Sequence, residues 1–297
     1  MDILGKSKIW LGIAGGLMFL AILALSLWGL NLGIDFKGGS LLEMQMDPRA
    51  KIGEMEKSLS GFNLKNLKIT PSEQKKYIVR TEQISEKQKN QILEKLQKQF
   101  SKSQITETRF ETVGPVVSKD LTTKALWAVF IATIAIILYI AWAFKSIPKP
   151  ANSFKFGISA IIAMLHDLLI VIGVFSLLGH FFNVEIDTLF ITALLTIMGY
   201  SVNDTIVIYD RIRESLIKRT EGDFKTIANT AIVETLPRSL NTGMTALFAL
   251  IVLYIVLGSS IKFFLLALIL GIISGTYSSI CIAPPILVFW HKQIGRK

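Results

Sequence analysis

The stretch GYSVNDTIVIYDRIRE, residues 199–214, sets an amide and a carboxylate side by side in an otherwise apolar helical segment. These groups are Asn203 and Asp204. Placing an ionised carboxylate in the hydrocarbon of a bilayer costs about 2.5–3.5 kcal/mol even on insertion scales. The stretch therefore predicts a membrane helix in which Asp204 is held by another part of a protein and has a function.

The rest of the chain has the composition of a membrane protein. Of its 297 residues 51% are hydrophobic, and the mean hydropathy is +0.51. The apolar residues gather into blocks with the charges between them. A span of a bilayer about 30 Å thick takes roughly 20 helical residues. The blocks long enough to span lie at 9–30, 124–144, 157–179, 186–209, 239–258 and 263–289. The first is interpreted as an anchor, because its apolar core exceeds that of a cleaved signal peptide.

The net charge of +10 is concentrated in some of the loops. Lys and Arg gather before the first span and in the segments 145–155, 211–225 and 292–297, whereas the loop 180–187 has none. By the positive-inside rule the basic segments and both termini are cytoplasmic, and residues 31–123 lie outside the cytoplasm. No nucleic-acid-binding motif accompanies the positive charge, so no nucleic-acid partner is expected. The single cysteine, Cys281, excludes an intrachain disulfide.

Residues 31–123 read as a globular domain between the first two spans. Asp47-Pro48 is predicted to start a helix that runs to about Ser60, and Ser85 to Gln88 form a capping box that opens a second, amphipathic helix. Strands are predicted at 40–46, 64–70, 76–81 and 104–113, with a turn at Pro71-Ser72. The order β-α-β-β-α-β predicts an α+β ferredoxin-like domain. It contains no metal cluster and no nucleophile–base pair, so we expect a binding or moving domain, no enzyme and no cofactor.

Polar side chains follow narrow stripes of three consecutive spans. The stripe of the fourth span contains Thr192, Thr196, Gly199 and Asn203, with Asp204 beside it; the stripe of the fifth contains Arg238, Asn241, Thr242, Thr245 and Ala249; and the third carries His166 and Asp167 near its middle. The spacing of three and four residues places each stripe on one helix face. The remaining faces are apolar and suit lipid.

Asp204 and Arg238 are predicted to meet near the cytoplasmic side of the membrane. Asp204 lies seven residues before Arg211, which is about 10 Å at 1.5 Å per residue. A carboxylate that is ionised beside an arginine and protonated when the arginine leaves would make a proton relay. A static buried pair that fixes helix packing is the alternative. His166 and Asp167 are equally open to a packing role or a relay role, and Gly271-x-x-x-Gly275 with Ser274 and Ser278 indicates a close-packing stripe.

The segment GIDFKGGS, residues 33–40, joins the first span to the outer domain. Gly38-Gly39 permits backbone angles that other residues avoid, which favours a sharp turn or hinge. Asp35 and Lys37 can cap nearby backbone or pair at the membrane surface. The glycine spacing, which starts at Gly33, fits neither nucleotide-binding fingerprint.

Together four motifs resemble the SecF family, the smaller subunits of SecD–SecF protein-export complexes and relatives of the resistance-nodulation-division transporters. The motifs are GIDFKGG, the His166-Asp167 pair, GYSVNDTIVIYDRIRE and ETLPRSLNTGMTAL at 234–247. The resemblance covers nearly the whole chain. It implies a SecD partner with six further spans, a bacterial inner-membrane location, and use of proton flow to draw secreted chains from the Sec channel (SecYEG type). It assigns Asp204 and Arg238 to the proton pathway, and His166 and Asp167 match a further motif of the family. From the residues themselves, Asn203 is expected to take part in proton movement beside Asp204, and Gly199, Gly271 and Gly275 are expected to take part in helix packing.

Two other functions compete with this interpretation. The chain could be half of a transporter for a small hydrophobic molecule or lipid, although it has no internal repeat that supplies the second half. It could also be a non-transporting scaffold of the export channel, in which case Asp204 and Arg238 would be structural. An enzyme is the weakest alternative, because no nucleophile, base and orienting group fall together.

Overall fold

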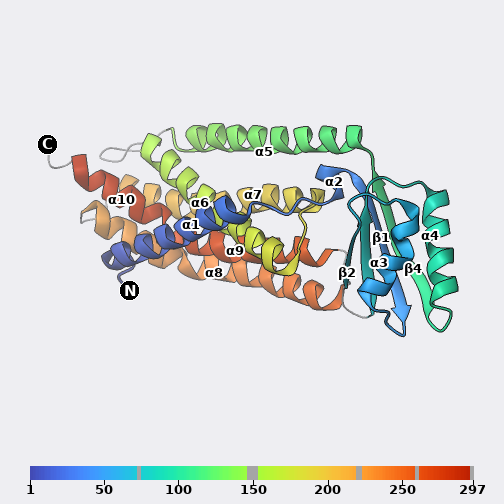
Figure 1. Cartoon of the computed structure of the whole chain (residues 1–297). Coiled ribbons are helices and arrows are strands. Elements are labelled where there is room, and N and C mark those ends of the chain that lie inside the picture. The colour runs from blue at the N-terminus through green and yellow to red at the C-terminus, as the bar shows by residue number, and fades with distance from the viewer. Residues whose placement is uncertain (72–74, 146–152, 219–222, 258–260, 295–297) are drawn as a thin grey trace. The chain divides into compact units, whose positions relative to one another are not determined.

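The structure is a computed structural model that describes residues 1–71, 75–145, 153–218, 223–257 and 261–294 (Figure 1). The chain divides into two compact units. One consists of Met1–Asn31 and Leu126–Lys297, and the other of Leu32–Ala125. Parts of the predicted basic loops, including Lys149, Arg219, Arg296 and Lys297, lie outside the described residues, as does Ser72 of the predicted turn.

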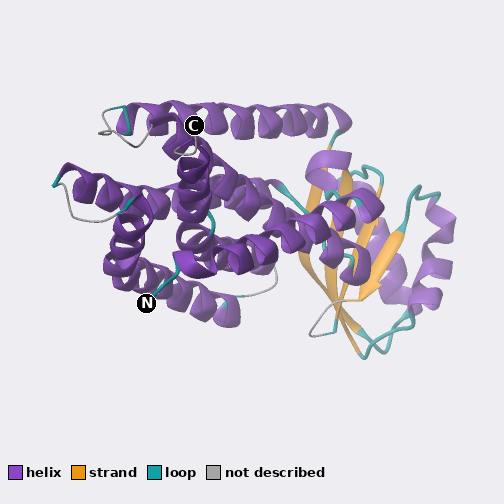
Figure 2. Cartoon of the chain, turned by 90° about the vertical axis from the view of Figure 1, so that its left-hand side faces the viewer, coloured by secondary structure: helices purple, strands orange, loops and turns teal. Residues whose placement is uncertain are grey.

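The first unit is built from long apolar helices, and the described residues contain six segments able to span a membrane by length and composition. All six predicted spans are confirmed, and the chain is a multi-pass membrane protein. The helices are α1 (Ser7–Trp28, after the 3-10 turn Leu4–Lys6), α5 (Pro115–Ala143), α6 (Ser153–Phe182), α7 (Thr188–Ile217), α8 (Phe224–Val256), α9 (Lys262–Cys281) and α10 (Ala283–Ile294). Helix α5 runs apart from the others over most of its length in both views (Figures 1 and 2), and its C-terminal end meets α6, where a Cβ added at Gly157 would lie 3.7 Å from Ile140.

The sixth span differs from its prediction because it consists of two helices. Helix α9 ends at Cys281, and Ile282 departs from helical geometry with φ −120°. Pro284 and Pro285 then fall in the first turn of α10, where a missing N–H breaks no internal helix bond. The sequence therefore interrupts the sixth span without ending it.

Helix α1 packs closely against α6 through small residues. A Cβ added at Gly173 of α6 would lie 2.4 Å from Ala21 Cβ and 2.6 Å from Ala21 Cα of α1. Close by, the Ser176 hydroxyl donates to the Ala24 carbonyl at 3.0 Å and the Gly29 carbonyl at 2.6 Å. Small residues allow two membrane helices to approach at backbone distance, which is the source of their packing energy.

Replacing Gly173 by alanine is expected to destabilise this contact by about 1–3 kcal/mol, the usual cost of overpacking. The new methyl group would press on the backbone of Ala21, which cannot move aside as a flexible side chain would. Thermal unfolding of the purified protein in detergent measures the effect. The matched control is Gly12→Ala on α1, where an added Cβ meets nothing within 4 Å. Equal melting temperatures for the two variants would contradict the close contact.

The second unit contains the predicted ferredoxin-like domain, which the structure confirms. Its sheet has the strand order β2-β3-β1-β4, and all its pairs are antiparallel. Figure 2 shows the strands in orange with helices against the sheet. The elements are α2 (Ile34–Lys37), β1 (Gly39–Asp47), α3 (Ile52–Leu59, followed by the 3-10 turn Ser60–Phe62), β2 (Lys68–Pro71), β3 (Lys76–Thr81), α4 (Glu86–Gln99) and β4 (Gln104–Val113).

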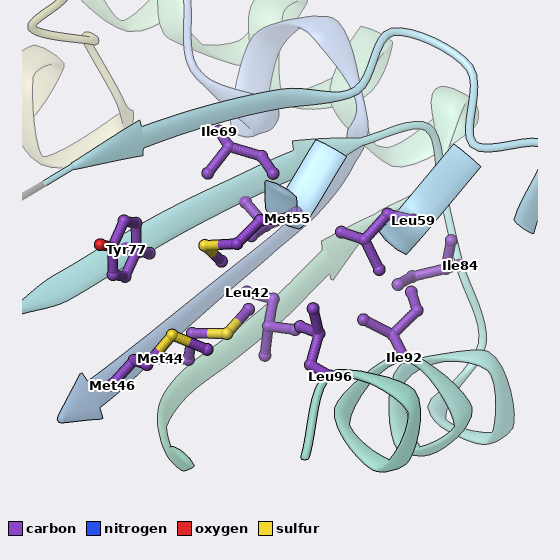
Figure 3. Close-up of a cluster of buried hydrophobic side chains, with 11 residues drawn as sticks. Leu42, Met44, Met46, Met55, Leu59, Ile69, Tyr77, Ile84, Ile92 and Leu96 are labelled. Atoms are coloured by element: carbon purple, nitrogen blue, oxygen red, sulfur yellow. The ribbon is translucent and has the colours of Figure 1, made fainter. Parts of the chain in front are cut away.

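The core of this domain lies between the sheet and its two longer helices. Alternate residues of β1 point to one face, so Leu42, Met44 and Met46 are all buried there. Figure 3 shows them beside side chains from the two helices, which are Met55 and Leu59 of α3 and Ile92 and Leu96 of α4. The alternation of apolar residues in β1 and their helical spacing in α3 and α4 therefore place these side chains in one packed layer between the sheet and the helices.

One helix start was predicted wrongly and another correctly. Helix α3 begins at Ile52 rather than after Asp47, because Asp47 still pairs with Gln104 as the last residue of β1. Strand pairing thus overrides the local Asp-Pro signal. At α4 the predicted capping box is present, since Ser85 and Gln88 each bond the other's backbone. Here no strand competes for the same residues.

Candidate functional site

Asp167 is the most completely bonded side chain in the membrane unit. Its residue is 0% exposed, and both carboxylate oxygens accept hydrogen bonds. Oδ2 accepts from the hydroxyls of Ser201 and Ser278 at 2.6 Å each, and Oδ1 accepts from Ser274 at 2.7 Å and lies 3.1 Å from His166 Nδ1. The serines come from α7 and α9, so one carboxylate on α6 ties three helices together.

His166 lies beside Asp167 and is equally buried, at 1% exposure. Its Nδ1 contacts the carboxylate, while its Nε2 is buried with no hydrogen-bond partner among the described residues. Its ring lies 6.2 Å from that of Tyr277 on α9. The structure puts the His166 ring and the Asp167 carboxylate in contact, and their role in proton movement stays a prediction.

Asp204 occupies a second buried position, nearer the C-terminal end of α7 than Ser201. The residue is 6% exposed, and its Oδ2 accepts from the Ser279 hydroxyl of α9 at 2.7 Å. In the described part of the chain this is the one hydrogen-bond donor to Asp204. Tyr200, one turn earlier on α7, lies near the Thr276 hydroxyl of α9 at 3.3 Å.

Arg238 is not paired with Asp204 in this structure. Within the described residues no ion pair joins the two, and Arg238 is exposed on α8. Asn203 is exposed on the other side of α7 from the buried contacts. The predicted pairing of Asp204 with Arg238 therefore requires α8 or the arginine side chain to move.

The polar stripes of α7 and α8 face outward from the membrane unit. Thr192, Thr196, Gly199 and Asn203 on α7, and Arg238, Asn241, Thr242, Thr245 and Ala249 on α8, are all exposed. We call these residues the polar stripe. Amide, hydroxyl and guanidinium groups at membrane depth are costly against lipid. We therefore expect another protein to cover this surface in the membrane.

An ion-pair cluster connects α7 and α8 beyond the Asn203 and Arg238 end of the polar stripe. Arg211 on α7 donates to Glu234 on α8 at 2.6 Å and to Glu214 at 2.6 Å, and Lys218 also contacts Glu214 at 2.6 Å. Exposed ion pairs of this kind contribute little to stability. They can exchange partners at small cost if α8 shifts.

The predicted packing glycines behave differently from one another. A Cβ at Gly271 would lie 2.2 Å from Ile197 of α7, and one at Gly275 would lie 3.4 Å from Ser201 Cα. Gly199 has nothing within 4 Å of an added Cβ and belongs to the exposed stripe. Of the three predicted packing glycines, Gly271 and Gly275 therefore make close helix contacts and Gly199 does not.

The serines around the two carboxylates were not identified as ligands from the sequence. The sequence pattern places Ser274 and Ser278 in the packing stripe with Gly271 and Gly275, and no pattern marks Ser201 or Ser279. The available signal was the run of small hydroxyl residues on one face of an apolar helix. Such hydroxyls hydrogen-bond across membrane helices.

The junction segment forms a tight connection. Gly33 precedes the four-residue helix α2, and Gly38 and Gly39 have φ of 76° and 124°. A Cβ at Gly39 would lie 2.6 Å from the Thr81 carbonyl oxygen. Both positions therefore need glycine, and a hinge role stays a prediction. Asp35 and Lys37 lie in α2 itself.

Nowhere among the residues with assigned positions do three or more His, Cys, Asp or Glu side chains gather as a metal site would require.

Comparison with known families decides the classification. The SecD/SecF GG motif model matches residues 29–48, which include Gly38-Gly39. The model of the C-terminal part of the protein-export membrane proteins SecD and SecF matches residues 92–293, more than half of the chain. The chain belongs to the SecD/SecF family.

Curated relatives place it on the SecF side of the family. It is 40% identical over 281 residues to the protein translocase subunit SecF of Thermobaculum terrenum, covering 91% of this chain and 87% of the relative. It is 36% identical over 295 residues to the SecF of Anaerolinea thermophila, covering 98% and 94%. The chain is accordingly a SecF-type subunit in protein translocation.

Solved structures support the same family assignment. The chain resembles SecDF, a translocon-associated membrane protein from Thermus thermophilus, with a TM-score of 0.85 and 32% identity over 98% of its length. A SecDF structure in a super-membrane-facing form gives a TM-score of 0.69 at 31% identity over 100% of its length. The chain spans 39% of each of those SecDF chains.

Proposed function

We propose that this chain works with a SecD-type subunit as a proton-driven accessory to the Sec channel. It would lie in the bacterial cytoplasmic membrane with both termini in the cytoplasm and its ferredoxin-like domain on the outer face. Proton entry would be coupled to the late steps of export, when the unfolded chain leaves the channel. The role is transport rather than catalysis.

The polar stripe beside buried Asp204 is the observation that carries this proposal. Its hydroxyl, amide and guanidinium groups are exposed on the isolated chain, although hydrocarbon would surround them. The SecDF chains that this structure matches are longer than it is, and the matched part is 39% of their length. The unmatched part of a SecDF-like assembly would supply the spans that cover the stripe.

Substituting Thr245 with tryptophan is expected to weaken assembly with the SecD-type subunit at least about tenfold, which corresponds to 1.4 kcal/mol. The bulky ring would hold the two membrane surfaces apart at the centre of the α8 stripe. The matched control is Ile251→Trp, an exposed residue of α8 about 120° around the helix from Thr245 at 100° per residue. Co-purification of the two subunits after coexpression measures the effect. Equal recovery for both variants would show that the stripe is not the interface.

Asp204 supplies the proton-binding group in this proposal. When ionised it would pair with Arg238 or with a donor of its own chain, and when neutral it would release that partner. A proton that crosses a membrane potential of 100 mV releases about 2.3 kcal/mol. This energy is enough to shift a few-kcal/mol equilibrium between two helix arrangements. Beside Asp204, His166 and Asp167 would hold α6 against α7 and α9.

The outer domain would turn such a shift into work on the exported chain. Gly38 and Gly39 connect α2 to strand β1 with positive φ, so the junction can serve as the hinge. One of the SecDF structures that this chain matches is named as a super-membrane-facing form, and such a named form supports a moving outer domain in this proposal. A domain that binds an unfolded segment in one position and releases it in another would bias movement outward.

The direct test uses sealed vesicles that contain the Sec channel and the SecD-type subunit, with and without this chain. Completion of export is measured in the presence and absence of a proton gradient. The expected result is a stimulation that needs both the chain and the gradient. Stimulation by the chain that persists without any gradient would identify a scaffold instead. Gradient-driven uptake of a lipid or hydrophobic probe with no effect on export would identify a transporter.

A further inference from the structure

Helix α9 contacts both buried carboxylates of the membrane unit, but it does so unequally. Its Ser274 and Ser278 hydroxyls donate to Asp167, and the adjacent Ser279 donates to Asp204 at 2.7 Å. Consecutive residues on a helix point about 100° apart. Ser278 and Ser279 can therefore serve carboxylates on two different helices, α6 and α7.

Asp167 is saturated and Asp204 is not. Both oxygens of Asp167 are occupied, by three hydroxyls and the His166 ring. A proton added to Asp167 would have to displace one of these buried donors and leave it without an acceptor. Among the described residues Asp204 has a donor only on Oδ2, so its Oδ1 is open to a proton. The geometry makes Asp167 a fixed anchor and Asp204 the group that exchanges.

Ser279 is suited to both protonation states of Asp204. Its hydroxyl lies 2.7 Å from Asp204 Oδ2 and 3.1 Å from the Thr276 carbonyl oxygen of its own helix. When Asp204 is ionised, the hydroxyl donates to the carboxylate. When Asp204 has taken up a proton at Oδ1 and its carboxyl group has rotated to exchange the two oxygens, the hydroxyl can turn to donate to Thr276 and accept the proton of the carboxylic acid. Neither state leaves a buried donor without a partner.

The other titratable or charged groups around this point do not take that role. On α7, Tyr200 lies near Thr276 rather than hydrogen-bonded to Asp204. On α6, Asp167 and His166 already bond to each other. On α8, Arg238 is exposed, and on α9, Tyr277 donates to the Trp10 carbonyl of α1 while Cys281 is buried.

We propose that Ser279 is the positioning residue for proton exchange at Asp204, the partner that holds this carboxylate while Arg238 is away from it. The inference rests on the proposed function of Asp204. It gives the relay two arrangements, with Asp204 on Ser279 or on Arg238. Helices α6, α7 and α9 stay joined through Asp167 in both, so α8 is the helix that moves.

The test compares the stimulation of export by a proton gradient in the assembled complex for Ser279→Ala and Ser279→Thr, with the parent and Asp204→Asn as references. A hydrogen bond to a charged group contributes enough to change an equilibrium about tenfold or more, so Ser279→Ala is expected to reduce the stimulation roughly tenfold. Ser279→Thr keeps the hydroxyl and is expected to restore it. The matched control is Ser26→Ala on α1, whose hydroxyl donates to the Ile22 carbonyl of its own helix and is exposed.

A double variant separates this role from packing. Because Asp204→Asn is expected to abolish the stimulation, the double variant is compared by melting temperature: if Ser279 acts through its bond to Asp204, the losses of melting temperature in the two single variants do not add. Full stimulation in Ser279→Ala, or an additive loss in the double variant, would overturn the inference, and so would equal losses in the alanine and threonine variants at parental melting temperature. If Ser279→Thr is itself unstable, the double variant decides. If Asp204→Asn keeps full stimulation, the proposed function of Asp204 fails instead, whatever Ser279 does.

Discussion

Replacing Asp204 by asparagine is expected to remove the whole benefit of a proton gradient for export, while the chain still assembles with its SecD-type subunit. Asparagine has nearly the same size, and its amide oxygen can still accept the hydrogen bond from Ser279. It cannot exchange a proton. The measurement is the ratio of export completed with and without the gradient in sealed vesicles, and the expected ratio for the variant is about one, because a relay without its titrating group does no coupling.

The matched control is Asp120→Asn on α5, an exposed aspartate that pairs with Lys124 one turn away. This variant should keep the ratio of the parent, since exposed pairs of this kind contribute at most about 1 kcal/mol. A parental ratio in Asp204→Asn would mean that the carboxylate only holds the helices together. The proton path would then have to be sought elsewhere, with His166 as the next group to replace.

Replacing Asp167 by alanine is expected to lower stability by at least about 3 kcal/mol, because the hydroxyls of Ser201, Ser274 and Ser278 lose their common buried acceptor. Some of these hydroxyls can turn to carbonyls of their own helices, as Ser278 already does towards Gly275 at 3.2 Å. Removing the carboxylate also removes the hydrogen bonds that join α6 to α7 and α9. Thermal unfolding in detergent, followed by intrinsic fluorescence, measures the change.

Asp120→Ala is the control for the removal of a carboxylate from an exposed site, and its melting temperature should match that of the parent. The milder Asp167→Asn separates anchoring from relay. An asparagine variant with parental stability but no gradient benefit would show that Asp167 itself exchanges protons. Destabilisation together with a residual gradient benefit would support the anchor.

Local signals in the sequence predicted most of the fold. The six spans follow from block length, and the outer domain follows from alternation in strands such as 40–46 and from the capping box at Ser85. These features depend on residues close together in the chain. Where a longer-range contact competed, as at Asp47, the local signal gave the wrong helix start.

The candidate site was only partly predictable because its contacts join distant residues. Ser201, Ser274 and Ser278 meet Asp167 across separations of 34, 107 and 111 residues. Nothing in the sequence distinguishes Ser278 from Ser279, although they bond to different carboxylates. The charges themselves stood out because an intramembrane carboxylate is costly, but the donors that hold them are ordinary serines. Whether Arg238 points inward or outward depends on helix placement, which no local pattern fixes.

The polar stripe also bears on the life of the chain before it meets a partner. A newly inserted copy presents Asn203, Arg238 and a row of threonines to lipid, so its free energy in the membrane is higher than that of the assembled subunit. Association relieves this cost, and an orphaned copy carries it throughout its existence. Its exposed polar groups would give a membrane protease or chaperone a means to distinguish surplus chains. The same surface that couples two subunits would thus balance their amounts in the cell.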